Sequence, residues 1–74
     1  MKIKLDDSRS RKGYVVMYEL DGEEKWEVTL ESARTGDTFT LVSNDQRRAE
    51  NKFEQMKNWV LGRKHNAREI RREV

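Results

Sequence analysis

The side chains that could act as nucleophiles, acids or bases lie apart along this chain. His65 is the only histidine and stands in a basic stretch, where burial or a carboxylate partner is not expected, so we interpret it as a surface residue. The carboxylate pairs Glu23/Glu24 and Glu27/Glu31 fall at an expected turn and on an expected solvated strand face, which favours an acidic surface over acid–base work. No plausible base stands beside the serines Ser8, Ser10, Ser32 and Ser43. The sequence therefore predicts a protein that is not an enzyme.

The sequence also lacks the residue patterns of a metal site or a phosphate-binding loop. The chain has no cysteine and one histidine, and it lacks the Asp-x-Asp pattern of a calcium loop. Its glycines, at positions 13, 22, 36 and 62, are isolated, so no cluster could cradle a phosphate. We therefore expect no metal and no cofactor.

Composition bounds the class of protein. The 74 residues are 41% charged and 34% hydrophobic, enough for one small domain, residues 1–74, that buries about 60% of its unfolded surface. The absence of cysteine excludes disulfides and fits a reducing compartment. No apolar run approaches the roughly 18 residues of a membrane span, and no signal peptide is visible. We therefore expect a soluble, cytoplasmic protein with no membrane partner.

In the first part of the chain, segments in which apolar and polar residues alternate are separated by polar turn segments. Lys25–Glu31 is the clearest case, with an apolar residue at every second position. Asp6–Lys12 and Ser32–Asp37 are polar and are interpreted as loops. The strands predicted in this way are Met1–Leu5, Tyr14–Leu20, Lys25–Glu31 and Thr38–Val42.

The period changes from 2 to 3.6 after residue 42. Ser43 with Gln46 three residues later resembles a capping box, and Gly62 suits the left-handed position after a helix. Trp59 flanks the stripe of Ala49, Phe53, Met56 and Val60. A second, short helix is predicted from Asn66, with the stripe Ala67, Ile70 and Val74. The fold class is therefore α+β: an antiparallel sheet of three or four strands, a C-terminal helix on one face, and a short second terminal helix.

The pair Asp21-Gly22 sets the register of the central hairpin. Asp-Gly between alternating apolar residues favours a two-residue type I′ turn, in which Tyr18 faces Lys25. Trp26, Val28 and Leu30 then share the core face with Val15 and Met17, and the residues left on the opposite face are Tyr14, Val16 and Tyr18. A three-residue loop at 20–22 would instead shift the register by one and bury both tyrosines.

The outer sheet face is the leading candidate for a binding site. Tyrosines ringed by charges are typical of the centre of a protein interface, because each offers a rigid apolar area and a hydroxyl. The alternative is that both tyrosines are buried, or exposed only because they favour strands. The candidate protein-binding residues are Tyr14, Val16, Tyr18, Lys25, Glu27 and Glu31. A homodimer through Val15/Met17 or Tyr14/Tyr18 is a further possibility.

A second candidate is nucleic acid, because the net charge of +2 is unevenly distributed. Residues 44–74 carry nine basic and five acidic side chains, and basic clusters are what phosphate contacts need. Against this, Glu69 and Glu73 interrupt the tail, and Glu27 and Glu31 would repel phosphates from the sheet. The basic residues of this alternative are Arg9, Arg11, Lys12, Arg63, Lys64, Arg68, Arg71 and Arg72.

Taken along most of its length, the chain resembles a family of very small phage anti-CRISPR proteins that inhibit type I-F surveillance complexes. The features that carry the resemblance are a Met-Lys start, a strand ending Tyr18-Glu19, an x-Gly turn, an alternating strand ending Leu30-Glu31-Ser32, a glycine turn at Gly36, a helix and the basic tail Arg71-Arg72-Glu73. The family folds as a four-stranded antiparallel sheet backed by helices. The resemblance thus implies a phage or mobile-element inhibitor whose partner is a host protein complex.

The resemblance also suggests which residues bind. In that family a tyrosine on the second strand and a glutamate closing the third contact a lysine-rich repeated subunit and block access of target DNA. Those positions match Tyr18 and Glu31 here. The family's further tyrosine, on the first strand, has no counterpart, because Leu5 and Asp6 stand near that position.

Overall fold

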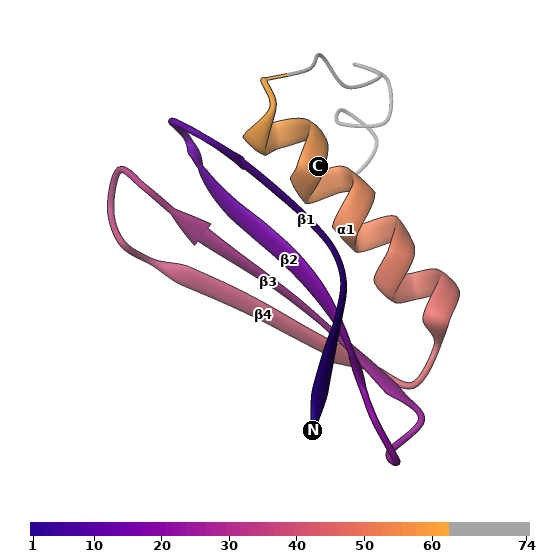
Figure 1. Cartoon of the computed structure of the whole chain (residues 1–74). Helices are drawn as coiled ribbons and strands as arrows, with labels where there is room; N and C mark the ends of the chain where they lie inside the picture. Colours follow the sequence, from indigo (N-terminus) through magenta and orange to yellow (C-terminus); the bar gives the residue numbers. More distant parts are fainter. Residues whose placement is uncertain (63–74) are drawn as a thin grey trace.

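The computed structural model describes residues 1–62, which form one sheet and one helix. All neighbouring strands are antiparallel, in the order β1-β2-β3-β4, and the helix lies on one face of the sheet (Figure 1). The elements are β1 (Lys2–Ser10), β2 (Gly13–Leu20), β3 (Lys25–Ser32), β4 (Thr38–Ser43) and α1 (Gln46–Val60). The predicted α+β class is confirmed. The predicted second helix lies outside the described residues.

The core lies between α1 and the two central strands. The predicted stripe of α1 is confirmed, since Ala49, Phe53, Met56 and Val60 are all buried. They meet Val15 and Met17 of β2 and Val28 of β3, with Trp26 and Leu30 partly buried beside them. Burying one large apolar side chain of this kind contributes roughly 1.5–3 kcal/mol. Because Val15 and Met17 are covered by α1, the proposed dimer through these two residues is wrong.

The hairpin between β2 and β3 has a longer loop than predicted. Leu20 pairs with Lys25, so the loop is the four residues 21–24, with positive φ at Gly22 (83°) and Glu24 (53°). Both the two-residue turn and the three-residue loop are therefore wrong. The longer loop keeps Glu23 and Glu24, poor strand residues, outside the ladder.

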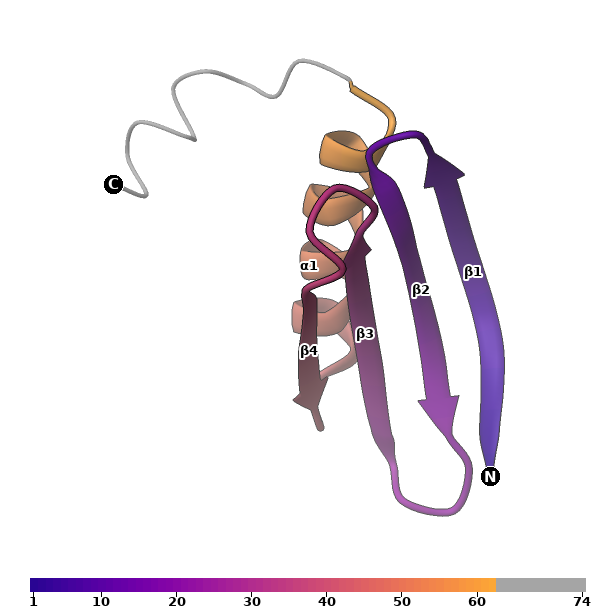
Figure 2. The same cartoon turned by 90° about the vertical axis from the view of Figure 1, so that its left-hand side faces the viewer.

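The predicted distribution of side chains between the two faces nevertheless holds. Relative to the two-residue turn, the observed register is shifted by two residues, since Tyr18 faces Glu27 and not Lys25. A shift of two leaves every side chain on its original face, whereas a shift of one would exchange the faces. Tyr14 and Tyr18 consequently lie on the face away from α1. Figure 2 shows the sheet from this side, with α1 behind it.

β1 is longer than predicted and runs through most of the expected loop. It pairs with β2 as far as Ser10 opposite Gly13, so the expected loop Asp6–Lys12 shrinks to a turn at residues 11 and 12. The register shifts between Lys4 and Asp6, a β-bulge at residue 5. Because of this extra residue, Lys4 and Asp7 emerge on the same face. The pairing partner, not local sequence, makes this polar segment a strand.

The N-cap of α1 lies two residues after the predicted one. Asp45, not Ser43, is the N-cap: its carboxylate accepts hydrogen bonds from the backbone N–H of Arg47 (3.0 Å) and Arg48 (3.3 Å). The buried Ser43 instead accepts a hydrogen bond from the backbone N–H of Asp45 (2.9 Å). At the other end, Gly62 has φ 72°, and the predicted left-handed position after the helix is confirmed.

Candidate functional site: the open face of the sheet

The face of the sheet opposite α1 is here called the open face. It brings together β1 residues that the sequence placed in a loop and β2 and β3 residues that the sequence predicted as a binding face. On β4, Thr40 continues this face because it pairs with Thr29. The open face consists of Lys2, Lys4, Asp7, Arg9, Tyr14, Val16, Tyr18, Leu20, Lys25, Glu27, Thr29, Glu31, Thr38, Thr40 and Val42.

Val16 forms a small buried centre on this face. It is only 3% exposed although α1 lies on the other side of the sheet. Its cross-strand partners are Asp7 and Thr29, and Tyr14 and Tyr18 are its neighbours on the same face of β2. Both tyrosines are half-buried, so neither is a core residue and neither stands free. The face therefore presents an apolar centre enclosed by polar side chains.

Cations of β1 lie over both tyrosine rings. The guanidinium carbon of Arg9 is 4.7 Å from the ring centroid of Tyr14. The ammonium nitrogen of Lys2 is 5.2 Å from the ring centroid of Tyr18. Such cation–π contacts are worth about 0.5–1 kcal/mol at exposed sites. They hold the rings against the sheet and give the aromatic surface a positive rim.

Asp7 links the same rim to the tyrosine hydroxyl. Its carboxylate accepts hydrogen bonds from the hydroxyl of Tyr14 (3.1 Å) and from the ammonium group of Lys4 (3.3 Å). These bonds, first the one from Tyr14, lower the pKa of Asp7. Burial, followed by the bond to Asp7, raises the pKa of Tyr14, and the bond to Asp7 raises the pKa of Lys4.

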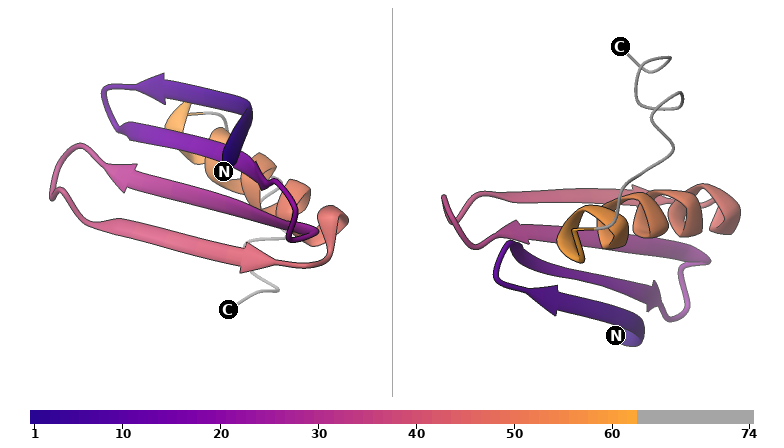
Figure 3. Two further views of the ribbon diagram at one scale, coloured as in Figure 1. Left: turned by 60° about the horizontal axis from the view of Figure 1, so that its bottom comes forward. Right: turned by 90° about the horizontal axis from the view of Figure 1, so that it is seen from above.

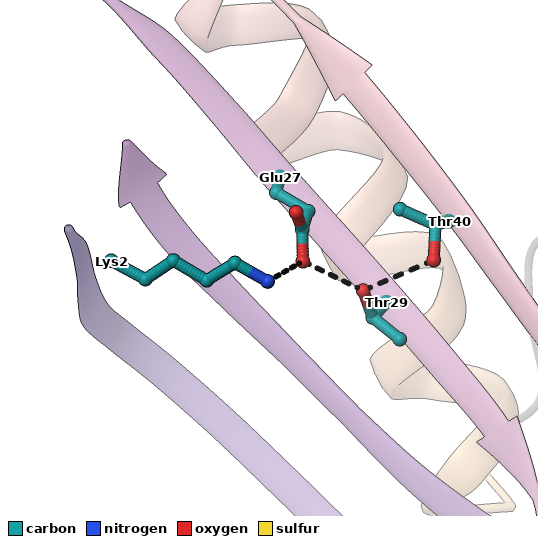
Figure 4. Close-up of polar contacts among 4 residues, drawn as sticks. All are labelled: Lys2, Glu27, Thr29 and Thr40. Carbon is teal, nitrogen blue, oxygen red and sulfur yellow. Dashed lines mark hydrogen bonds and ion pairs between the residues drawn. The ribbon is translucent and has the colours of Figure 1, made fainter. Parts of the chain in front are cut away.

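Glu27 is committed to contacts within the fold. Its Oε2 atom accepts from the ammonium group of Lys2 (3.0 Å) and from the hydroxyl of Thr29 (3.2 Å), and the Thr29 hydroxyl lies 3.3 Å from that of Thr40 (Figure 4). These contacts link β1, β3 and β4, and the Lys2 side chain passes over β2 to reach Glu27. With its side chain only 14% exposed, Glu27 stabilises the sheet and offers little charge to a partner.

The remaining predicted residues lie at the two ends of β3. Lys25 stands at its first position and Glu31 near its last, and both are exposed. Glu31 pairs with Tyr14, and Tyr18 pairs with Glu27. Tyr18 and Glu31 thus share the open face, with Glu31 beside Tyr14 and therefore at the far end from Tyr18. Among residues 1–62, Glu31 has no side-chain hydrogen bond or ion pair, which leaves its carboxylate accessible.

Sequence reasoning missed the contribution of β1 to this face. Lys2, Lys4, Asp7 and Arg9 surround both tyrosines, yet only Arg9 was a candidate, and only for nucleic acid. The alternation of charged residues with serines over residues 7–10 was the available signal, since it has the period of a strand.

Of the described residues of the nucleic-acid alternative, Arg9 lies on the open face, whereas Arg11 and Lys12 lie at one end of the sheet. Arg11 and Lys12 form the β1–β2 turn, and the Lys12 ammonium group lies 5.3 Å from the ring centroid of Trp59. The hydroxyl of Ser10 donates to the carbonyl of Val60. The turn is therefore attached to the C-terminal end of α1. The other basic candidates, Arg63, Lys64, Arg68, Arg71 and Arg72, lie outside the described residues.

An apolar cleft of about 360 Å³ opens on the helix side of the sheet, between α1 and the strands β3 and β4. Phe39 faces α1, yet it is 49% exposed at this cleft. The cleft is lined by Leu30, Phe39, Lys52, Gln55, Met56 and Trp59.

Residues 1–62 contain no group of three or more histidine, cysteine or acidic side chains placed to hold a metal ion. The one helix in this part of the chain is neither long nor apolar enough to span a bilayer. No protein-family model, curated protein or solved structure matches the chain.

Proposed function

We propose that this chain is a non-enzymatic binding protein that docks its open face on another protein complex and blocks that complex sterically. The observation that supports this most is the half-buried pair Tyr14 and Tyr18 around a buried Val16, on the one face of the sheet that α1 leaves uncovered. Aromatic residues at such a centre, surrounded by polar side chains, are the usual composition of a binding hot spot.

Within this proposal Tyr18 is the main anchor. Tyr14 has its hydroxyl engaged by Asp7, whereas within residues 1–62 the hydroxyl of Tyr18 has no hydrogen-bond partner and its ring lies under the Lys2 ammonium group. Glu31, at the far end of the face, pairs with a basic residue of the partner. Glu27 has a supporting role, because Lys2 and Thr29 already occupy its carboxylate.

The kind of partner follows from the resemblance to the anti-CRISPR family. The two residues that match the family's contact positions, Tyr18 and Glu31, lie on the same open face here. We therefore propose a phage or mobile-element inhibitor of a type I-F surveillance complex, acting in the cytoplasm of the host. A lysine-rich subunit would meet the free carboxylate of Glu31 and the tyrosine rings.

Affinity capture from a nuclease-treated lysate of a host that carries a type I-F complex tests this proposal. The wild type retains the complex, and Tyr18→Ala loses it, because removing a true anchor costs about 2 kcal/mol or more of binding free energy. Asn51→Ala, on the exposed side of α1, is the matched control and retains the complex. If Tyr18→Ala unfolds the domain, the tyrosine is a structural residue and the docking proposal fails.

Nucleic acid is the second candidate, supported by one observation. The turn with Arg11 and Lys12 is fastened to the end of α1, immediately before the sequence continues into Arg63 and Lys64. A fluorescence anisotropy titration with a labelled DNA duplex tests it. Steep weakening by salt, together with loss of affinity in Arg11→Ala, would favour this candidate over protein docking.

A further inference from the structure

The two edge strands of the sheet differ in how well they are protected against pairing with another chain. β1 and β4 lie at opposite edges (Figure 3). β1 carries a bulge at residue 5 and a row of charged side chains, Lys2, Lys4, Asp6, Asp7 and Arg9. Bulges and edge charges are the devices by which natural sheets prevent edge-to-edge association.

β4 has none of these devices. Its sequence, Thr38–Ser43, contains no charged residue and no proline, and its register with β3 is uninterrupted from Thr38 to Ser43. Two large apolar side chains are exposed on it, Phe39 and Val42, each 49%. Threonine and valine at alternate positions also favour an extended strand. The backbone groups on the outer side of β4 are therefore a regular, uncharged template for one more strand.

The apolar cleft lies beside this same edge. Phe39 of β4 contributes to it together with Trp59 of α1, which is 41% exposed. An added strand would therefore gain backbone hydrogen bonds along β4 and apolar contact on the helix side. A strand added at β1 would meet no such cleft among the described residues and would face charged side chains.

We propose that the occupant of the β4 edge is a second copy of this chain, which pairs its own β4 antiparallel to the first. The two sheets then form one continuous sheet of eight strands about a two-fold axis. The assembly is independent of the function proposed for the open face, because it uses the outer edge of β4 and none of the proposed docking residues Tyr14, Tyr18 and Glu31.

The sequence of β4 determines the register of this pair. Paired residues in a continuous sheet share a face, so two-fold pairing must centre on a residue. Centring on Thr40 sets Phe39 against Leu41 of the second copy and Thr38 against Val42 of the second copy. Centring on Leu41 would instead set Phe39 against Ser43 of the second copy and lose an apolar pair. The first register is favoured because it matches apolar side chains on the helix side.

A second copy of this chain is the favoured partner for the β4 edge, because no charge repulsion opposes the pairing. In the Thr40-centred register the pairs within residues 38–42 are all neutral, and Asp37 meets only Ser43 of the second copy, whereas two copies of β1 would bring charged side chains together. Only residues 38–42 of each copy pair within β4, so the contact is short and we expect a weak, concentration-dependent dimer below the size of a standard stable interface.

Charge placed on the axis provides the test. Thr40 is exposed and lies on the open face, so Thr40→Lys and Thr40→Glu are compatible with the monomer fold. Each variant alone sets two like charges directly opposite each other, which weakens dimerisation by about fivefold or more. Mixed in equal amounts, the two variants form a heterodimer with opposite charges, and association returns to at least the wild-type level.

Sedimentation velocity over a concentration series up to about 1 mM measures these equilibria. Thr35→Lys, in the exposed β3–β4 loop, is the control and leaves dimerisation unchanged. A wild type that stays monomeric throughout the series overturns the proposal. So does a dimer that neither Thr40 variant weakens, or a weakened pair that mixing fails to restore, since association would then use another surface.

Discussion

The hydroxyl of Tyr14 donates a 3.1 Å hydrogen bond to the carboxylate of Asp7, across the pairing of β2 with β1. This contact joins the polar residues 6–10 of β1 to the aromatic centre of the open face. It fixes the orientation of one tyrosine and leaves Tyr18, two positions further along β2, as the ring without a hydroxyl partner among the described residues. The difference underlies the roles proposed for the two tyrosines.

The first prediction concerns the pH dependence of this contact. The folded pKa of Asp7 is lower than its ordinary value of 3.8. Its bond with Tyr14 therefore adds stability that is fully present above that value and is lost as the pH falls through the folded pKa. We expect the stability difference between wild type and Tyr14→Phe to shrink on acidification, as measured by urea unfolding at several pH values. A difference that does not depend on pH in the acid range would contradict the contact.

At high pH the dependence of stability on pH has the opposite sign, because the titrating group is the hydroxyl of Tyr14. The folded pKa of Tyr14 lies above its ordinary value of 10.0, chiefly because of burial and then because of the carboxylate of Asp7. The corresponding stability is present below pH 10.0 and is lost as the pH rises through the folded pKa. In Asp7→Asn the second cause is absent, so the pKa of Tyr14 falls while remaining raised by burial. Phenolate absorbance, with Tyr18→Phe as the background for both proteins, measures the change. An unchanged Tyr14 titration would show that Asp7 does not act on it.

The second prediction uses a glycine where two strands approach closely. A Cβ atom on Gly13 would lie 2.2 Å from the carbonyl oxygen of Glu31, a backbone atom that cannot rotate away. We expect Gly13→Ala to lower the free energy of unfolding by about 2 kcal/mol or more. Gly36→Ala is the comparison: it meets nothing within 4 Å and bears only the strain of φ +79°, which costs about 1 kcal/mol. Equal losses in urea unfolding would mean that β2 and β3 do not approach as described.

The third prediction tests the helix cap. Asp45→Ala removes the acceptor of two backbone N–H groups, so the free energy of unfolding should fall by about 1 kcal/mol. Asn44→Ala, at the neighbouring exposed position, should have little effect. Chemical denaturation of the three proteins measures this. If the Asn44 variant lost more stability than the Asp45 variant, the helix would begin elsewhere.

The fourth prediction separates structural from docking roles of two glutamates on the open face. Glu27 is held by Lys2 and Thr29, so we expect Glu27→Ala to cost up to about 1 kcal/mol of stability. Glu31 has no such contact, and Glu31→Ala should change stability by less than about 0.5 kcal/mol. For the affinity for the partner we expect the opposite order, with Glu31→Ala weakening binding more than Glu27→Ala. A Glu31 variant that loses stability but binds normally would invert the assignment.

Which side chains lie on which face of the sheet was predictable from sequence, because it depends only on whether the hairpin loop has an even or an odd number of residues. Any loop of even length between β2 and β3 places Trp26 on the same face as Met17 and keeps Tyr18 on the other face. Loop length itself was not predictable from the Asp-Gly pair, since positive φ at Gly22 and Glu24 serves a four-residue loop equally well. The helical stripe was predictable for a similar reason: a buried face imposes its period on the sequence.

The polar half of β1 was not predictable in this way. Residues 6–10 bury no apolar side chain and become a strand only by pairing with β2 over its whole length. Their contacts, Asp7 with Tyr14 and Arg9 over the same ring, are non-local. The cap at Asp45 was missed because Ser43 and Asp45 both have side chains suited to the position. The choice depends on the fold around Ser43, which is buried where β4 ends.

The most direct test of the docking account is to measure target-DNA binding by a purified type I-F surveillance complex in the presence of this protein. The wild type should abolish DNA binding, and Asn51→Ala should do so at the same concentration. Tyr18→Ala should need about 30-fold more protein for the same inhibition, which corresponds to an anchor worth about 2 kcal/mol. Undiminished DNA binding at saturating wild-type protein, or equal inhibition by folded Tyr18→Ala, would contradict the proposed function of the open face.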